Sequence, residues 1–399
     1  MGFGVYLWVG EFSGDCQWVY GGDCGEASIE LGEDFFGGAG GVGGLDDDSL
    51  CGIEAEFIGM KEFIDSLESG EDLGGEAVSR AVEGLLSLEV READKVRFLK
   101  ALRVKGETAG EIAGFVKAFL ERAVDPGLEV SRLPGPMIDV CGTGGDRQDL
   151  FNVSTTVMFV LAAAGATVVK HGNRAITSQC GGADVLEELG VSIELAPRDF
   201  RRCVEAHGVG FLFAPAYHPA FRVIGPVRRA LAAEGIPTIF NLLGPLLNPA
   251  RPRYQLVGVF AEEILPKYGE ALGLLDRERV WAVHGNGMDE LSLGGTSAVC
   301  EVVGGERKYF RIDAGDWGLE ACAVEELKGG DRGKNAAILT GILGGTVGGG
   351  CRDLVLLNAA AGLVITGIAA DLGSGLERAR AELDSGRALG KLRELQAFV

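Results

Sequence analysis

A glycine-rich turn and the polar residues that follow it are the first features of this 399-residue chain that could do chemistry. Residues 142–146 read Gly-Thr-Gly-Gly-Asp and follow the apolar run that begins at Met137. Backbone amides in such a turn, with a helix N-terminus behind them, bind anions, and glycine lets a phosphate approach the backbone. Many strand-to-helix turns contain glycine only to close the turn, so this motif alone leaves phosphate binding open.

Asn152, Ser154 and Thr155 add side-chain donors at the start of the helix that should follow the turn. Such residues often do no more than cap a helix. One of them can cap the helix while its neighbour binds a phosphate oxygen.

A second polar segment, residues 170–178, reads Lys-His-Gly-Asn-Arg-Ala-Ile-Thr-Ser and follows another apolar run. Two cations, an imidazole, an amide and two hydroxyls at the carboxyl end of a strand are typical of a ligand site in an open α/β sheet. A solvated loop is the alternative, but Gly181-Gly182 follows at once and offers another place for close approach.

The elements that must position these segments alternate between apolar runs and helical stretches. Five runs are predicted to be buried strands: Met137–Cys141, Ala166–Lys170, Val209–Ala214, Tyr254–Phe260 and Arg279–His284. Alternation of this kind predicts an α/β domain with a mostly parallel central sheet and flanking helices, here over residues 137–399. We expect an amphipathic helix, or a pair broken near Gly386, over Leu376–Phe398.

Residues 60–126 are predicted to form a small N-terminal helical domain of three or four helices. Apolar residues keep helical spacing at Ala77, Ala81, Leu85 and Leu88, and Thr108 with Glu111 forms a capping-box pattern. Prolines at 126, 134 and 136 then interrupt the pattern. A later helical stretch, residues 218–234, is predicted to return to this domain, so that the two domains flank a cleft.

Residues 1–59 differ from the rest of the chain. The first fifty residues hold fourteen glycines, and residues 1–60 hold twelve acidic residues without a single Lys or Arg. This composition predicts a flexible segment, and Met60 is a possible start of the native product. A regulatory or partner-binding tail is the alternative.

Composition sets the class of protein. With 47% apolar and 24% charged residues the chain can bury a large core, and no apolar run of 18 residues or basic secretory start occurs. We therefore expect a cytoplasmic protein that does not enter a membrane. Nine cysteines without a Cys-x-x-Cys pair favour reduced thiols over disulfides or a structural metal, and the net charge of −21 argues against a nucleic-acid partner.

Taken in order, these motifs resemble the anthranilate phosphoribosyltransferase family. Residues 142–146 and 151–155 (Phe-Asn-Val-Ser-Thr) are joined by the segment at 170–174 and by four further motifs in the family's order. These are Phe-Ala-Pro-Ala-Tyr-His-Pro at 213–219, Pro-Val-Arg-Arg at 226–229, Thr-Ile-Phe-Asn-Leu-Leu-Gly-Pro-Leu-Leu-Asn-Pro at 238–249 and His-Gly-Asn-Gly-Met-Asp-Glu at 284–290. The resemblance covers Met60 to the C-terminus.

The resemblance implies a transfer of the 5-phosphoribosyl group from phosphoribosyl pyrophosphate to the amine of anthranilate, with Mg²⁺ as cofactor. It assigns the sugar donor to Gly142, Thr143, Gly144, Gly145, Asp146, Asn152, Ser154, Thr155, Lys170, Asn173, Ser178 and Gly182. It assigns anthranilate to Gly142, His171, Asn173, His218 and Arg228, whose guanidinium can pair with a carboxylate at two points. Metal binding falls to Ser154, Asp289 and Glu290, and no residue is committed as an acid or base.

The resemblance also implies a homodimer formed through the helical domain. Departures are modest: Arg147-Gln148 follows Asp146 where glycine is common, and Thr177 stands where serine is common. Three alternatives remain open: a same-fold transferase with another aromatic acceptor, a pyrimidine nucleoside phosphorylase, and a non-catalytic nucleic-acid-binding relative. The last would want a basic groove, which the acidic balance of the chain disfavours.

Overall fold

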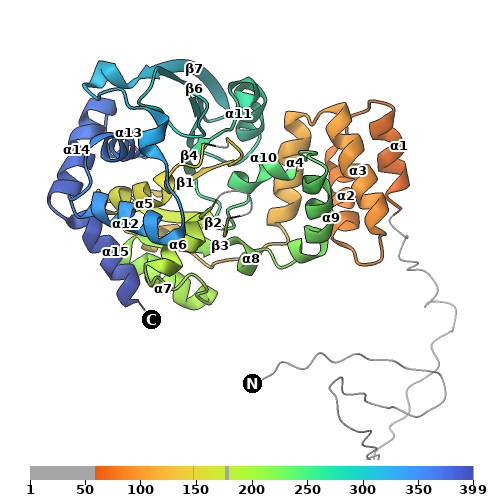
Figure 1. The fold of residues 1–399 in the computed structure, drawn as a ribbon. Coiled ribbons are helices and arrows are strands. Elements are labelled where there is room, and N and C mark those ends of the chain that lie inside the picture. The colour runs from red at the N-terminus through yellow and green to blue at the C-terminus, as the bar shows by residue number, and fades with distance from the viewer. Residues whose placement is uncertain (1–58, 147, 176–178, 399) are drawn as a thin grey trace, which may run out of the picture. The chain divides into compact units, whose positions relative to one another are not determined.

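The computed structural model describes residues 59–146, 148–175 and 179–398, all within one compact unit, Phe57–Val399. The expectations for residues 1–58, Arg147, Thr177 and Ser178 lie outside the described residues. Figure 1 shows a group of helices and a sheet with helices packed on it, so the predicted fold class is confirmed.

Four helices open the described chain, each with an apolar face directed inward. They are α1 (Lys61–Glu68), α2 (Gly75–Leu86), α3 (Glu92–Lys105) and α4 (Ala109–Leu120). The capping box that begins α4 is confirmed: the Thr108 hydroxyl accepts from the Glu111 N–H, and the Glu111 carboxylate accepts from the Thr108 N–H. The expectation for Leu88 is wrong, because α2 ends at Leu86 and the Leu88 side chain is 87% exposed.

A later helix, α9 (Phe221–Ala233), packs against α2 and α3 (Figure 1). Its buried residues Ile224, Val227 and Leu231 belong to the same apolar core as α1 to α4. The core continues through α10 (Phe240–Leu243) and α11 (Leu265–Gly273) onto one face of the sheet.

The sheet has seven strands in the order β3-β2-β1-β4-β5-β6-β7. The five predicted strands are confirmed as parallel neighbours: β1 (Met137–Gly142), β2 (Thr167–Gly172), β3 (Val209–Phe213), β4 (Tyr254–Gly258) and β5 (Arg279–Gly285). The sequence reasoning missed β6 (Thr296–Val303) and β7 (Glu306–Asp313), which add to β5 as an antiparallel hairpin.

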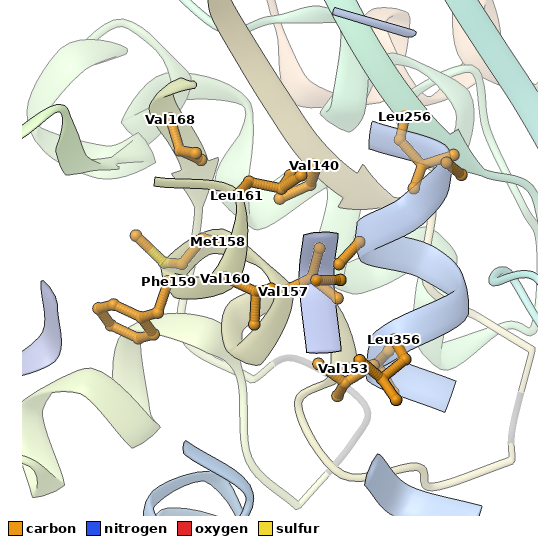
Figure 2. Close-up of a cluster of buried hydrophobic side chains, with 14 of the residues drawn as sticks. Val140, Val153, Val157, Met158, Phe159, Val160, Leu161, Val168, Leu256 and Leu356 are labelled. Carbon is orange, nitrogen blue, oxygen red and sulfur yellow. The ribbon is translucent and has the colours of Figure 1, made fainter. Parts of the chain in front are cut away.

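Alternate residues of the central strands face opposite cores, as the period of two in a strand requires. On β5, Trp281 and Val283 pack in one core, whereas Val280 and Ala282 pack in the core shared with the helical group. The first core is closed by α5 (Val153–Ala163) and α13 (Gly349–Ile365), and Figure 2 shows Val153 and Val157 of α5 clustered with Leu356 of α13. The sheet is therefore covered on both faces.

The remaining helices complete the cover of the sheet. They are α6 (Gly182–Glu188), α7 (Pro197–His207), α8 (Ala214–Tyr217), α12 (Arg332–Leu343), α14 (Leu372–Asp384) and α15 (Arg387–Ala397). Short 3-10 turns occur at Val130–Arg132, Gly244–Leu246, Glu262–Ile264, Ala314–Trp317 and Val324–Leu327. The break predicted near Gly386 is confirmed, since this glycine has φ 73° between α14 and α15. No helix among the described residues is long and apolar enough to cross a membrane.

Candidate active site

The glycine turn leaves the sheet at the carboxyl end of β1. Gly144 and Gly145 have φ values of 66° and 84°, a conformation that glycine adopts without steric cost. Thr143 is held by two bonds to the neighbouring strand end: its N–H donates to the Gly258 carbonyl at 2.9 Å, and its Oγ1 accepts from the Phe260 N–H at 3.0 Å. The turn is thereby fixed above the ends of β1 and β4.

The acidic pair reaches this turn from the end of β5. Asn286 and Gly287, with φ values of 50° and 80°, form a tight reversal closed by hydrogen bonds between Gly285 and Met288. Asp289 then lies over the turn, where its Oδ2 accepts from the Gly144 N–H at 2.7 Å. Gly144 and Asp289, which are 145 residues apart in the sequence, therefore belong to one site.

Two paired glycines make room for Asp289. Gly142 of β1 and Gly258 of β4 are register partners in the sheet. A Cβ on Gly142 would lie 2.2 Å from Asp289 Oδ2, and one on Gly258 would lie 1.5 Å from the Asp289 carbonyl oxygen. Any side chain at either position would displace the acidic loop.

The carboxylates in this loop repel one another. The pKa of Asp289 is raised to about 7, first by burial and then by the charge of Asp146, whose Oδ2 also accepts from the Asp289 N–H at 3.4 Å. Burial, and then the charge of Asp289, raise the pKa of Glu290 well above its usual value, whereas Lys170 and the Ser154 N–H lower it. Carboxylates that lie so close that the charge of one raises the pKa of the next make a favourable place for a cation.

Lys170, at the end of β2, lies beneath the glycine turn. It is 4% exposed, and its Nζ donates to the Val140 carbonyl at 2.5 Å and to Ser154 Oγ at 3.0 Å. Thr155 is buried beside Gly182, where an added Cβ would lie 3.0 Å from Thr155 Oγ1. A buried cation and hydroxyls thus converge at the start of α5.

Asn152 and Asn173 lie at the edges of this group. Asn152 caps nothing with its side chain; its Nδ2 donates to the Cys180 carbonyl at 3.1 Å, and its Oδ1 is buried without a partner among the described residues. Asn173 is exposed, and its carbonyl accepts from the Ala183 N–H at 3.2 Å. Gly145 is also exposed, and Ser178 lies outside the described residues.

A row of rings leads from β2 to α9. The rings of His171 and His218 meet edge to face at 5.4 Å, His218 stacks on Phe221 at 5.2 Å, and Phe221 meets Phe240 at 5.8 Å. The guanidinium of Arg228 lies 4.8 Å above the Phe240 ring. The structure thus connects three of the predicted acceptor residues through two aromatic rings.

Burial keeps both imidazoles neutral at physiological pH. The pKa of His171 is lowered to about 3, mainly by burial and then by the charges of His218 and Lys170. Burial also lowers the pKa of His218, whose Nε2 lies 2.7 Å from the Leu247 carbonyl. Burial alone lowers the pKa of Arg228, so no carboxylate of the described residues compensates its charge.

Sequence reasoning missed the support behind His171. Asp139 is fully buried; its Oδ1 accepts from the His171 N–H at 3.3 Å and its Oδ2 from Asn248 Nδ2 at 2.9 Å. Asn248 Nδ2 also donates to the Val169 carbonyl at 2.8 Å. A lone acid inside an apolar strand was the available signal, because such a group is costly to bury without partners.

Family models and known relatives match most of this chain. The helical bundle domain of the glycosyl transferase family matches residues 61–123, and the a/b domain of that family matches residues 134–389. An anthranilate phosphoribosyltransferase of Roseiflexus castenholzii is 46% identical over 84% of this chain and 97% of its own length. One of Anaeromyxobacter dehalogenans is 46% identical over 85% and 98%.

Solved structures agree with these relatives. Anthranilate phosphoribosyltransferase from Thermus thermophilus has a TM-score of 0.78 at 40% identity, covering 84% of this chain and 98% of that one. The Saccharomyces cerevisiae enzyme in complex with PRPP and Mg has a TM-score of 0.76 at 28% identity, covering 84% and 96%. The chain therefore belongs to the anthranilate phosphoribosyltransferase family of glycosyl transferases.

Proposed function

We propose that the chain transfers the 5-phosphoribosyl group from phosphoribosyl pyrophosphate to the amine of anthranilate, giving N-(5-phosphoribosyl)anthranilate and pyrophosphate. One observation carries the proposal: the glycine turn, Lys170 and the acidic pair converge at the sheet edge from which the row of rings runs toward Arg228. A polyanion and a small aromatic acid need these two kinds of surface.

The donor is assigned to the glycine turn and the polar residues around it. The Thr143 and Gly144 N–H groups already donate to the Gly258 carbonyl and to Asp289, so the start of α5 offers most of the partial positive charge to a phosphate that approaches the glycine turn. Lys170 supplies a full charge, and Ser154 and Thr155 supply hydroxyls. Asp146, Asn152, Asn173 and Gly182 complete the proposed set, together with Ser178 outside the described residues.

The residues present fit magnesium. Asp289 and Glu290 offer carboxylates whose mutual repulsion a divalent cation removes, and Ser154 lies beside Glu290. The described residues contain no cluster of three metal-ligating His, Cys, Asp or Glu side chains. Magnesium accepts such a site because it keeps waters and binds substrate phosphates. When bound, it neutralises negative charge on the departing pyrophosphate.

The acceptor is assigned to the surface near the two histidines. Because burial lowers the pKa values of His171 and His218, both side chains present an uncharged surface to the aromatic ring and neutral amine of the acceptor. Arg228 pairs with the carboxylate, and Gly142 and Asn173 lie on the donor side. The amine nitrogen forms a bond to the anomeric carbon while the bond to pyrophosphate breaks and its electrons leave with pyrophosphate. The nitrogen, now positively charged, then loses one proton to water. Positioning carries this step, so no residue is assigned as acid or base.

A fluorescence assay of anthranilate consumption tests the function. Wild-type protein should consume anthranilate only when phosphoribosyl pyrophosphate and Mg²⁺ are both present. The double variant Asp289→Asn with Glu290→Gln should lose magnesium-dependent turnover, whereas Glu262→Gln with Glu263→Gln, another adjacent acidic pair, should keep it. Unchanged turnover in the first variant would refute the metal assignment. If the donor were consumed with a different aromatic amine but not with anthranilate, the acceptor assignment would be refuted.

We also propose a homodimer formed through the helical group. A groove of about 670 Å³ between α1 and α3 is lined by apolar residues that include Leu67, Val96 and Val104, and by the charged residues Glu68, Arg97, Lys100 and Lys105. Val104 is 88% exposed. Light scattering should give twice the 41.8 kDa of one chain. A single-chain mass at micromolar concentration would refute the dimer.

We place the protein in the cytoplasm. The six described cysteines are all free thiols, a state that a reducing compartment maintains. Fractionation of the native cells with an antibody against the chain tests this location.

A further inference from the structure

Asn358 is a polar residue buried in the apolar middle of α13. It is fully buried, between neighbours that belong to the main core of the α/β part. Its Nδ2 donates to the Leu291 carbonyl at 3.1 Å and to the Leu354 carbonyl one turn earlier at 2.9 Å. Its Oδ1 accepts from the Leu291 N–H at 3.0 Å. An amide in this place is costly unless it is fully paired, and here it is paired at both ends.

The side chain does for Leu291 what a neighbouring β-strand would do. One amide satisfies both the donor and the acceptor of a single buried residue, and the bond to Leu354 fixes the direction in which the amide points. Leu291 is itself fully buried. Removal of Asn358 would leave both of its main-chain groups unpaired, which proteins avoid.

Leu291 directly follows the acidic pair. Asp289 is held from the other side, by the Gly144 N–H on its carboxylate and by Asp146 on its own N–H. The Asn358 amide holds the next turn of chain from behind. The loop that carries the acidic pair is therefore hydrogen-bonded on one side to the glycine turn and on the other side to α13, two elements that are distant in the sequence.

We propose that Asn358 is a positioning residue for the acidic pair, which sets the place of the Glu290 carboxylate through the main chain of Leu291. This inference rests on the proposed function, because that function assigns the metal to Asp289 and Glu290. Asn358 is not among the residues assigned to substrate or metal. Its loss should weaken metal binding without altering the acceptor surface.

The test compares Asn358→Leu and Asn358→Ala with wild type. Leucine removes both bonds to Leu291, and alanine removes the same bonds without adding bulk, so it serves as the second variant should leucine prevent folding. Loss of a group that orients a metal ligand typically costs about 10- to 100-fold in metal affinity. Electron paramagnetic resonance of free Mn²⁺, titrated with protein alone, should show at least about a tenfold weaker binding for Asn358→Leu. The Mg²⁺ concentration for half-maximal turnover should rise similarly, with an unchanged KM for anthranilate.

Thr366→Val is the matched control. Thr366 lies at the far end of the same helix, where its Oγ1 donates to the Gly362 carbonyl at 2.9 Å, so its loss destabilises α13 without touching the acidic pair. It should bind Mn²⁺ as wild type does. Wild-type Mn²⁺ binding by either folded Asn358 variant, or an equal loss in Thr366→Val, would overturn the inference. Failure of wild type to bind Mn²⁺ even when phosphoribosyl pyrophosphate is present would instead refute the metal assignment of the proposed function.

Discussion

The substitution Gly142→Ala tests how closely Asp289 must sit on the strand ends. The new Cβ would lie 2.2 Å from Asp289 Oδ2 and 2.7 Å from its Cγ, and Cβ atoms essentially never approach such atoms within 3.0 Å. The carboxylate must therefore retreat by about 1 Å. Gly142 does not have a positive φ, so alanine fits the backbone and the crowding falls on Asp289.

The expected loss follows from this displacement. A misplacement of about 1 Å in an active site can cost about 100-fold in rate, so kcat/KM should fall by about that factor. Crowding of a packed region costs about 1–3 kcal/mol, so the variant should still fold. The assay is anthranilate fluorescence at several Mg²⁺ concentrations, combined with thermal unfolding. The Mg²⁺ concentration for half-maximal turnover should rise.

Gly75→Ala is the control for this experiment. Gly75 begins α2, and nothing lies within 4 Å of the Cβ that alanine would add. It should match wild type in every measurement. A folded Gly142→Ala protein with wild-type kcat/KM and wild-type magnesium dependence would refute the claim that the site requires Asp289 in this position.

Three further predictions follow. Arg228→Lys should raise the KM for anthranilate about tenfold, because lysine lacks the two-point pairing, and leave the KM for the sugar donor unchanged; equal changes in both would contradict the acceptor assignment. Without metal, the raised pKa of Asp289 means that the folded state binds this proton more tightly than the unfolded state. The stability it contributes is full below about pH 4 and is lost as the pH rises through about 7, so the metal-free Tm should fall from pH 5 to pH 8, less so in Asp289→Asn. A chain that begins at Met60 should keep wild-type turnover, and a loss of activity in folded protein would show a role for residues 1–59.

The sequence predicted the parallel part of the fold because its strands are continuous apolar runs. It missed β7 because Glu306–Asp313 contains few apolar residues, shows no regular apolar–polar alternation and is mostly exposed. The edge hairpin still carried a signal, since Gly304 and Gly305 turn it with φ values of 56° and 88°. The prediction for Leu88 was wrong for a different reason. Its spacing from Leu85 fits a helix, but α2 already ends at Leu86.

The candidate site could be proposed from the sequence where its proposed ligand-binding residues stand together, as in the glycine turn and residues 170–174. Its supports were not, because they act across long separations. Asn358 holds a residue 67 positions away, and Asn248 reaches Asp139 across 109 positions. Nothing in the local pattern distinguishes such a side chain from an ordinary buried amide, and only the folded chain shows what it holds.

The charges of the site explain why metal and donor should bind together. The charge of Asp146 raises the pKa of Asp289, and the charges of Asp289 and Asp146 raise the pKa of Glu290, so a polyanion brought beside these carboxylates would meet further repulsion. Lys170 offsets part of this charge but is committed to Val140 and Ser154. A divalent cation shared by carboxylates and phosphates removes both repulsions at once, and such coupling is reciprocal. Each ligand therefore strengthens the binding of the other, and the position of Asp289 governs both.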